Sequence, residues 1–163
     1  MAFDAFLKIE GIEGESTDSA HQGQIEVLSF SFGVSNPTTI GSGSGGAGAG
    51  KASFQDFHFV SRLQKSAPSL FLACATGRHL KSATMSVRRA DRKFADFYKV
   101  RMDDVLVSSF TEGGASDGAE NVPLDQVSLA FAKIDIQYSV QDARGALGET
   151  VEVSFDLSEN ISG

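Results

Sequence analysis

Only the stretch from Lys65 to Gly77 carries the sequence signals of an α-helix, so most of the core must come from strands. Ser66 is placed to cap the first turn through its hydroxyl, Pro68 fits that turn without losing a hydrogen bond, and Gly77 suits a left-handed ending. The apolar stripe of this helix, about residues 66–76, comprises Ala67, Leu70, Phe71 and Cys74. Because such a stripe must be covered, we expect its two largest members to pack on a β-sheet or barrel.

Elsewhere, apolar residues alternate with polar ones at the period of two that marks β-strands. The expected strands cover residues 3–10, 25–34, 54–60, 83–88, 94–102, 105–110, 127–140 and 150–157. The fifth and sixth are either separate strands or a single bent strand broken at Asp103-Asp104. About eight strands and one helix are typical of a mainly β fold, a mostly antiparallel barrel or sandwich.

Two of the expected strands, residues 25–34 and 127–140, carry apolar side chains on both parities. In the first, a β-bulge near Leu28 would bring these side chains to one face; otherwise both faces are partly buried. An isolated barrel needs only one apolar face. We therefore expect outer faces or edges of these strands to be buried against other subunits.

Residues 36–50 are a low-complexity segment made mostly of glycine, serine and alanine. Such a segment could link two domains. However, the piece before it is too short to fold alone, and strand patterns resume directly after it. We therefore expect a single domain over residues 1–163, with an extended, protruding loop at 36–53.

The net charge of −7 argues against binding to nucleic acid or to an anionic membrane, since both require a basic surface. No apolar run approaches the ~18 residues that cross a bilayer, and the first residues lack the pattern of a signal peptide. We expect the chain to fold in the cytoplasm and to use an export route that accepts folded proteins. Cys74 is the only cysteine, which excludes an internal disulfide and a paired-cysteine metal site, and it is expected to be a small core residue.

The segment Gly45–Ala52 nearly matches the phosphate-binding loop G-x-x-x-x-G-K-[ST]. Ala52 replaces the required Ser or Thr, and a strand pattern follows where a helix is needed, so nucleotide binding is not expected. The histidines His21, His58 and His79 lack the spacing of a metal site. With no nucleophile–base pair either, we expect no enzyme activity, no metal and no cofactor.

A basic cluster, Arg88–Lys93, stands out in this acidic chain. It is either a solvated turn, which is the simpler interpretation, or a contact for an acidic partner.

Six motifs follow one another along nearly the whole chain. They are FLKI-x-GI-x-GES at 6–16, I-x-VLSFSFG at 25–33, the loop ending GAGK at 48–51, S-x-P-x-L-x-x-x-C-x-TG-x-H at 66–79, VLVSS at 105–109 and YSVQ at 138–141. This ordered set resembles the haemolysin-coregulated protein (Hcp) family, the tube protein of bacterial type VI secretion.

The resemblance implies an antiparallel two-sheet β-barrel with one flanking helix. It further implies a homohexameric ring with a wide channel, and rings that stack into a tube inside a contractile sheath below a VgrG-like spike. Such rings bind effector proteins in the channel, lie in the cytoplasm before firing, and are then secreted with the effectors without a signal peptide. No further sequence follows Gly163, so no fused effector domain is expected.

Two sets of residues are assigned to these roles. Ser29 and Ser31 lie on the parity opposite Phe30 and Phe32, so they should face outward if the phenylalanines fill the core. In a ring wall that face would line the channel, and we expect Ser31, with Ser29 second, to contact effectors. The loop expected to join stacked rings contains Gly41, Gly43, Gly45, Gly46, Gly48, Gly50 and Lys51.

Two other functions compete with a tube protein. A monomeric ligand-binding β-barrel of lipocalin type would have an apolar cavity, and a nucleotide hydrolase would bind ATP. The mass in solution distinguishes the first alternative from a ring.

Overall fold

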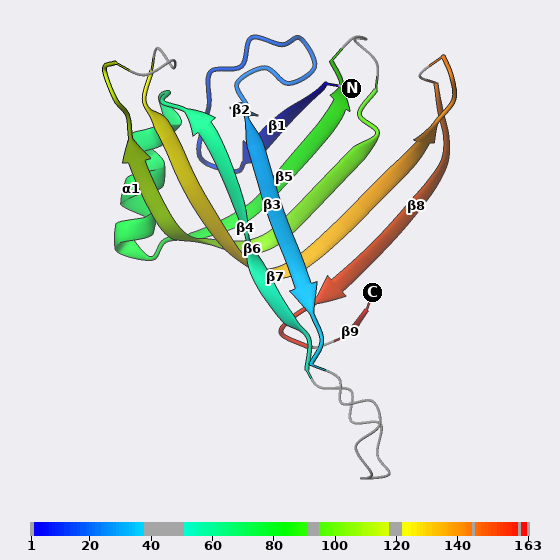
Figure 1. The fold of residues 1–163 in the computed structure, drawn as a ribbon. Coiled ribbons are helices and arrows are strands. Elements are labelled where there is room, and N and C mark those ends of the chain that lie inside the picture. The colour runs from blue at the N-terminus through cyan, green and yellow to red at the C-terminus, as the bar shows by residue number, and fades with distance from the viewer. Residues whose placement is uncertain are drawn as a thin grey trace.

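The computed structural model describes residues 2–37, 51–90, 95–117, 122–144, 146–159 and, for the backbone only, 161–162. In this part of the chain there are nine strands and one helix (Figure 1). They are β1 Phe3–Ile9, β2 Ile25–Val27, β3 Ser29–Ser35, β4 Ser53–Arg62, α1 Ser66–Thr76, β5 His79–Arg89, β6 Tyr98–Gly113, β7 Leu124–Gln141, β8 Leu147–Asp156 and β9 Ile161–Ser162.

All strand pairs are antiparallel and belong to one curled sheet, with the order β2-β1-β5-β6-β7-β4-β3. The second half of the long strand β7 pairs with β8, and β8 pairs with β9. Strands β2 and β3 lie at opposite ends of this order but are joined by Leu28, whose backbone N–H donates to the carbonyl of Val60 at 2.8 Å. The sheet therefore closes on itself, which confirms the mainly β, antiparallel fold with one helix.

Strand β6 is a single bent strand rather than two. Its inward side chains are Val100 and Met102 before Asp104, and Val105 and Val107 after it. Asp104 has φ +53°, a left-handed conformation that bends the strand and changes which parity faces the core. The neighbouring strand β7 changes inward parity in the same way.

Residues 25–34 change inward parity for a different reason. Ile25 and Val27 of β2 are buried, and after Leu28 the inward residues of β3 are Phe30 and Phe32. Both parities are thus apolar because the chain passes from one end of the sheet order to the other within one subunit. This corrects the sequence argument for assembly at Ile25, Val27, Phe30 and Phe32, because the subunit itself covers these side chains, whereas Val34 is 60% exposed.

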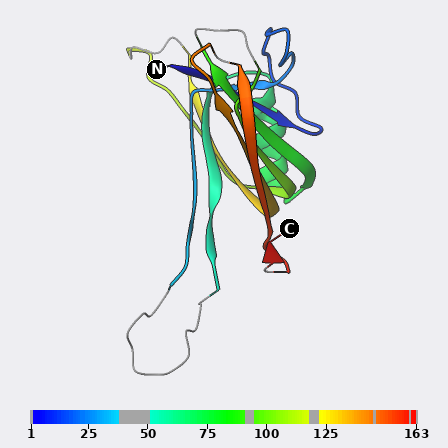
Figure 2. The ribbon, with the colours of Figure 1, turned by 90° about the vertical axis from the view of Figure 1, so that its right-hand side faces the viewer.

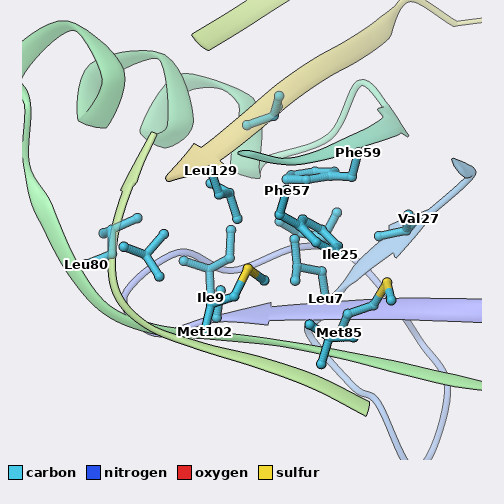
Figure 3. Close-up of a cluster of buried hydrophobic side chains, with 14 of the residues drawn as sticks. Leu7, Ile9, Ile25, Val27, Phe57, Phe59, Leu80, Met85, Met102 and Leu129 are labelled. Atoms are coloured by element: carbon cyan, nitrogen blue, oxygen red, sulfur yellow. The ribbon is translucent and has the colours of Figure 1, made fainter. Parts of the chain in front are cut away.

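The core fills the interior of the curled sheet (Figure 3). Its largest fully buried side chains are Phe57, Phe59, Leu7, Ile25, Leu70, Leu80, Met85, Met102 and Leu129. They come from six different strands and the helix, so the core joins distant parts of the sequence. Such a filled interior is the opposite of the open apolar cavity that a lipocalin-type barrel requires.

Helix α1 begins at Ser66, as predicted, but its N-terminal capping differs from the sequence prediction. Lys65 is the N-cap, and the buried hydroxyl of Ser66 has no hydrogen-bond partner among the described residues, so Ser66 does not cap the helix. The Glu15 carboxylate instead accepts a hydrogen bond from the Lys65 N–H at 2.9 Å, and the Glu15 N–H donates to the Gln64 side chain at 3.0 Å. A residue 50 positions away thus satisfies the helix start. Gly77 ends the helix with φ 64°, as predicted.

The buried face of α1 contains Ala67, Leu70 and Ala73, with Cys74 partly buried against the core. Leu70 is fully buried, but Phe71 is 61% exposed, so the prediction that both pack inward is wrong for Phe71. The ring of Phe71 lies edge-to-face on Phe110 of β6, with centroids 6.1 Å apart, at the rim of the contact between α1 and the sheet.

Candidate functional site

The two serines assigned from the sequence lie on the outer face of β3. Ser29 and Ser31 are exposed, while Phe30 and Phe32 pack against the core. The two phenylalanine rings stack on Phe57, with centroid distances of 6.2 and 5.8 Å. The serines therefore project away from the barrel interior. Figure 2 shows β3 and β4 running side by side as a long ribbon that carries this face.

The neighbouring strands extend the polar surface beyond the two serines. Ser31 is the cross-strand neighbour of His58 on β4, and His58 is the neighbour of Ser128 on β7. Nδ1 of His58 lies 3.1 Å from Oγ of Ser128. The Ser108 hydroxyl of β6 contacts both the Asp56 carboxylate, at 2.5 Å, and the carbonyl of Ser128, at 3.1 Å.

We name this surface the serine face. It consists of Ser29, Ser31, Asp56, His58, Ser108 and Ser128. Sequence reasoning found only the two serines of β3. The signal for two others was available, because Asp56 and His58 alternate with the inward Phe57 and Phe59.

The serine face does not have the geometry of a catalytic triad. A triad requires a histidine that contacts the nucleophilic hydroxyl with one nitrogen and a carboxylate with the other. His58 contacts the hydroxyl of Ser128, but Asp56 is bonded to a different serine, Ser108. The surface is instead a set of small hydroxyl groups with one histidine and one carboxylate, with Val60 opposite Ser29, and it is suited to reversible contact with a polar partner.

The loop residues Gly41, Gly43, Gly45, Gly46, Gly48 and Gly50 lie outside the described residues. Lys51 is described and is exposed. Strand β4 begins at Ser53, directly after Lys51-Ala52, so the helix that a phosphate-binding loop requires does not follow the motif.

The three histidines lie in separate surroundings. His21 is buried, stacks on the ring of Phe6 at 4.5 Å and contacts Asp96 at 2.9 Å. His79 contacts Asp104 at 2.9 Å. In the described ranges, no three His, Cys, Asp or Glu side chains form a group that could hold a metal ion.

Arg88 shows that the basic cluster is not simply a solvated turn. Its guanidinium is buried, pairs with both carboxylate oxygens of Asp18, and lies 5.0 Å from the centroid of the Phe6 ring. The hydrogen bond from Arg88 lowers the pKa of Asp18 to about 2. Arg88 therefore anchors the loop before β2 to strand β5. Residues 91–93 of the cluster lie outside the described residues.

A second surface carries exposed apolar side chains on the outer part of β7 and β8, and we name it the apolar wing. Its members are Tyr138, Val140, Val151 and Val153. Tyr138 pairs directly with Val151, and Val153 pairs with Ile136, so they lie on the face that continues outward from the core. Val151 and Val153 are 54% and 59% exposed. Exposed apolar groups gathered in this way mark a surface for a protein partner.

Comparison with known proteins identifies the family of this chain. The model of the family described as "Type VI secretion system effector, Hcp" matches residues 6–138. Protein hcp1 of Pseudomonas aeruginosa is 36% identical over 163 residues, which covers 99% of each chain.

The chain belongs to the Hcp family.

Solved Hcp structures have the same fold. Hcp1 from Salmonella typhimurium is 31% identical, with a TM-score of 0.83 and full coverage of both chains. A structure titled as a type six secretion system protein is 27% identical, with a TM-score of 0.93 over 99% of this chain and 100% of that one.

Membership in the Hcp family makes the chain a type VI secretion protein of a secreted, structural kind and not an enzyme, as the sequence predicted. Within the described part of the chain, no helix combines the length and apolarity needed to span a membrane.

Proposed function

We propose that this Hcp protein forms homohexameric rings that stack into the inner tube of a type VI secretion system. The rings would bind effectors in their channel, interact with the contractile sheath and a VgrG-like spike, and pass from the cytoplasm to the outside when the system fires. The apolar wing is the observation that carries the proposal, because it leaves a core-like surface uncovered in the isolated subunit.

A second exposed apolar surface lies on the opposite side of the subunit. It contains Leu63, Phe71 and Leu72 beside helix α1, whereas β8 lies at the other side of the sheet (Figure 1). A closed ring needs two different complementary surfaces on each subunit, one for each neighbour. Contact between the apolar wing of one subunit and the α1 side of the next fits this requirement.

The mass in solution tests the ring. Light scattering should report six copies of the 17.2-kDa chain at micromolar concentration. An isolated monomer at that concentration would contradict the ring and favour the alternative, a monomeric ligand-binding barrel.

The serine face is proposed to line the channel and to contact effectors through Ser31, with Ser29 second. Replacing Ser31 by Glu should leave the ring mass unchanged, because the side chain is exposed and the barrel does not depend on it. Retention of an effector by purified rings should fall, since a bulky charge would occupy a surface of small hydroxyls. Pull-down of a co-expressed effector measures this, with Ser19→Glu in the exposed loop before β2 as the matched control. Equal retention by both variants would contradict the assignment.

The glycine-rich loop is proposed to act separately, in stacking. Removing Gly41–Gly50 should leave single rings but abolish stacked tubes and secretion, because a shortened connection cannot reach the next ring. Electron microscopy and secretion assays measure the two outcomes. A loop of equal length made of alternating Gly and Ser is the control for length. If the shortened protein still forms tubes, another surface joins the rings.

A further inference from the structure

One end of the barrel contains polar side chains that the fold buries without partners. Asp125 of β7 is 0% exposed, and neither of its carboxylate oxygens has a hydrogen-bond partner among the described residues. The hydroxyls of Ser61 and Ser66 are equally buried and equally without partners. Burying such groups unpaired is costly, so they call for a ligand.

The three strands at this end bring a second carboxyl to Asp125. In the sheet register, Asp125 lies directly between Ser61 of β4 and Glu112 of β6. Burial, together with the neighbouring Glu112 carboxyl, raises the pKa of Asp125 to about 7. Two neighbouring acidic groups attract a cation.

Glu112 is exposed and connects the buried Asp125 to the surface. It lines an open pocket of about 240 Å³ between α1 and β6. The other lining residues are apolar, namely Leu63, Ala67, Pro68, Phe71 and Phe110. Apolar and aromatic walls with one carboxylate in the lining fit the side chain of Lys or Arg, whose aliphatic stem packs on the walls while its charge meets the acid. We name this site the acid pocket.

We propose that the acid pocket binds a basic side chain from the neighbouring copy of this chain in the ring. The proposal rests on the proposed function, because it needs the ring. Charge complementarity supports this occupant, as does the exposed apolar surface of Leu63 and Phe71 that continues from the pocket.

The β7–β8 turn is the segment that would deliver the basic group. It follows Val140 of the apolar wing directly, and it carries the exposed Arg144. Figure 1 shows this turn and the end of β6 that bears Glu112 at the same end of the barrel but at opposite sides. When neighbours are placed side by side with the apolar wing against α1, the turn of one subunit approaches the acid pocket of the next. We therefore assign Arg144 as the inserted residue.

The proposal has a pH signature that a purely structural role lacks. In the lone subunit the acid pair keeps a proton that the unfolded chain loses above about pH 4. The free energy of unfolding of the subunit therefore falls as pH rises from about 4 to about 7. Arg144 favours the ionised pair and releases that proton, so ring assembly should strengthen over the same range. The hydroxyl of Ser61 lies opposite Asp125 in the sheet register. Of the charged residues near it along the chain, Arg62 lies on the other parity of β4, and Lys65 pairs with Glu13 at 3.2 Å.

The test measures ring dissociation on dilution by light scattering, at pH 6 and pH 8. At pH 8, the rings of Glu112→Gln and of Arg144→Gln should each dissociate at a protein concentration about tenfold higher than the wild-type ring does. They should lose the strengthening between the two pH values, and the double variant should be no weaker than either single one. Asp125→Asn should behave alike, but Glu112 is exposed, so its variant tests the site even if the buried substitution impairs folding. Glu152→Gln on β8 is the matched control and should change neither property.

Each contrary outcome has a distinct meaning. If the wild-type ring forms but Glu112→Gln dissociates like the control, the acid pocket is not an interface and only this inference fails. If Ca²⁺ or Mg²⁺ strengthens the wild type while Arg144→Gln has no effect, the pocket binds a metal ion instead. If the wild type never forms a ring, the proposed function itself is wrong, and this inference falls with it.

Discussion

Replacing Leu70 by alanine should lower the free energy of unfolding by about 2–5 kcal/mol, the range measured for buried leucines. Leu70 is fully buried between α1 and the sheet, so its removal loses apolar burial and leaves a cavity. Phe71→Ala at the next position should cost less than about 1 kcal/mol, because that ring is largely exposed. Urea denaturation of both variants at the same protein concentration measures the difference.

The comparison tests which face of the helix holds it to the sheet. Both substitutions place alanine in the same helix, so intrinsic helix propensity changes little between them. The difference therefore reports packing. An equal loss for both variants, or an unchanged unfolding midpoint for Leu70→Ala, would mean that the buried face of α1 has been misassigned.

Short-range signals predicted most elements of the fold. Alternation located the strands, and Gly77 located the end of the helix, because both depend on residues close in sequence. The helix bounds, about residues 66–76, were predicted correctly, but the capping of its first turn was missed, because Glu15 and not Ser66 accepts the hydrogen bond there. Such a partner, far away in sequence, has no local signature.

Parity was the most misleading part of the sequence. Apolar residues on both parities indicated buried outer faces, but the left-handed Asp104 and the crossing at Leu28 explain most of them within one subunit. A non-glycine residue with positive φ is uncommon and cannot be read from composition. The surface on which the proposed ring contact rests, around Val153, becomes visible only when the fold shows how far β8 extends past the core.

The candidate site was predictable only where it depends on residues that are close in sequence. The outward direction of Ser29 and Ser31 follows from alternation with the neighbouring phenylalanines. That His58 and Ser128 lie beside them depends on the order and register of β3, β4 and β7, which no local pattern specifies. The acid pocket is a stronger case, because Glu112 of β6 meets Ala67 and Phe71 of α1 only in the folded chain.

Replacing Val153 by aspartate should convert the ring into monomers that retain their fold. Val153 is 59% exposed in the subunit, so a polar side chain there costs the monomer less than about 0.5 kcal/mol. In the ring, the proposal places Val153 against the next subunit, where an unpaired carboxylate would be buried at every interface. Because a closed hexamer repeats the contact six times, even a moderate penalty per contact should remove the ring at micromolar concentration.

Glu152→Gln changes the charge by one unit on the opposite face of β8 and should keep the ring. Light scattering gives the mass of each variant, and circular dichroism checks that both remain folded. A folded Val153→Asp protein that still has the wild-type mass would show that the apolar wing lies outside the ring contact.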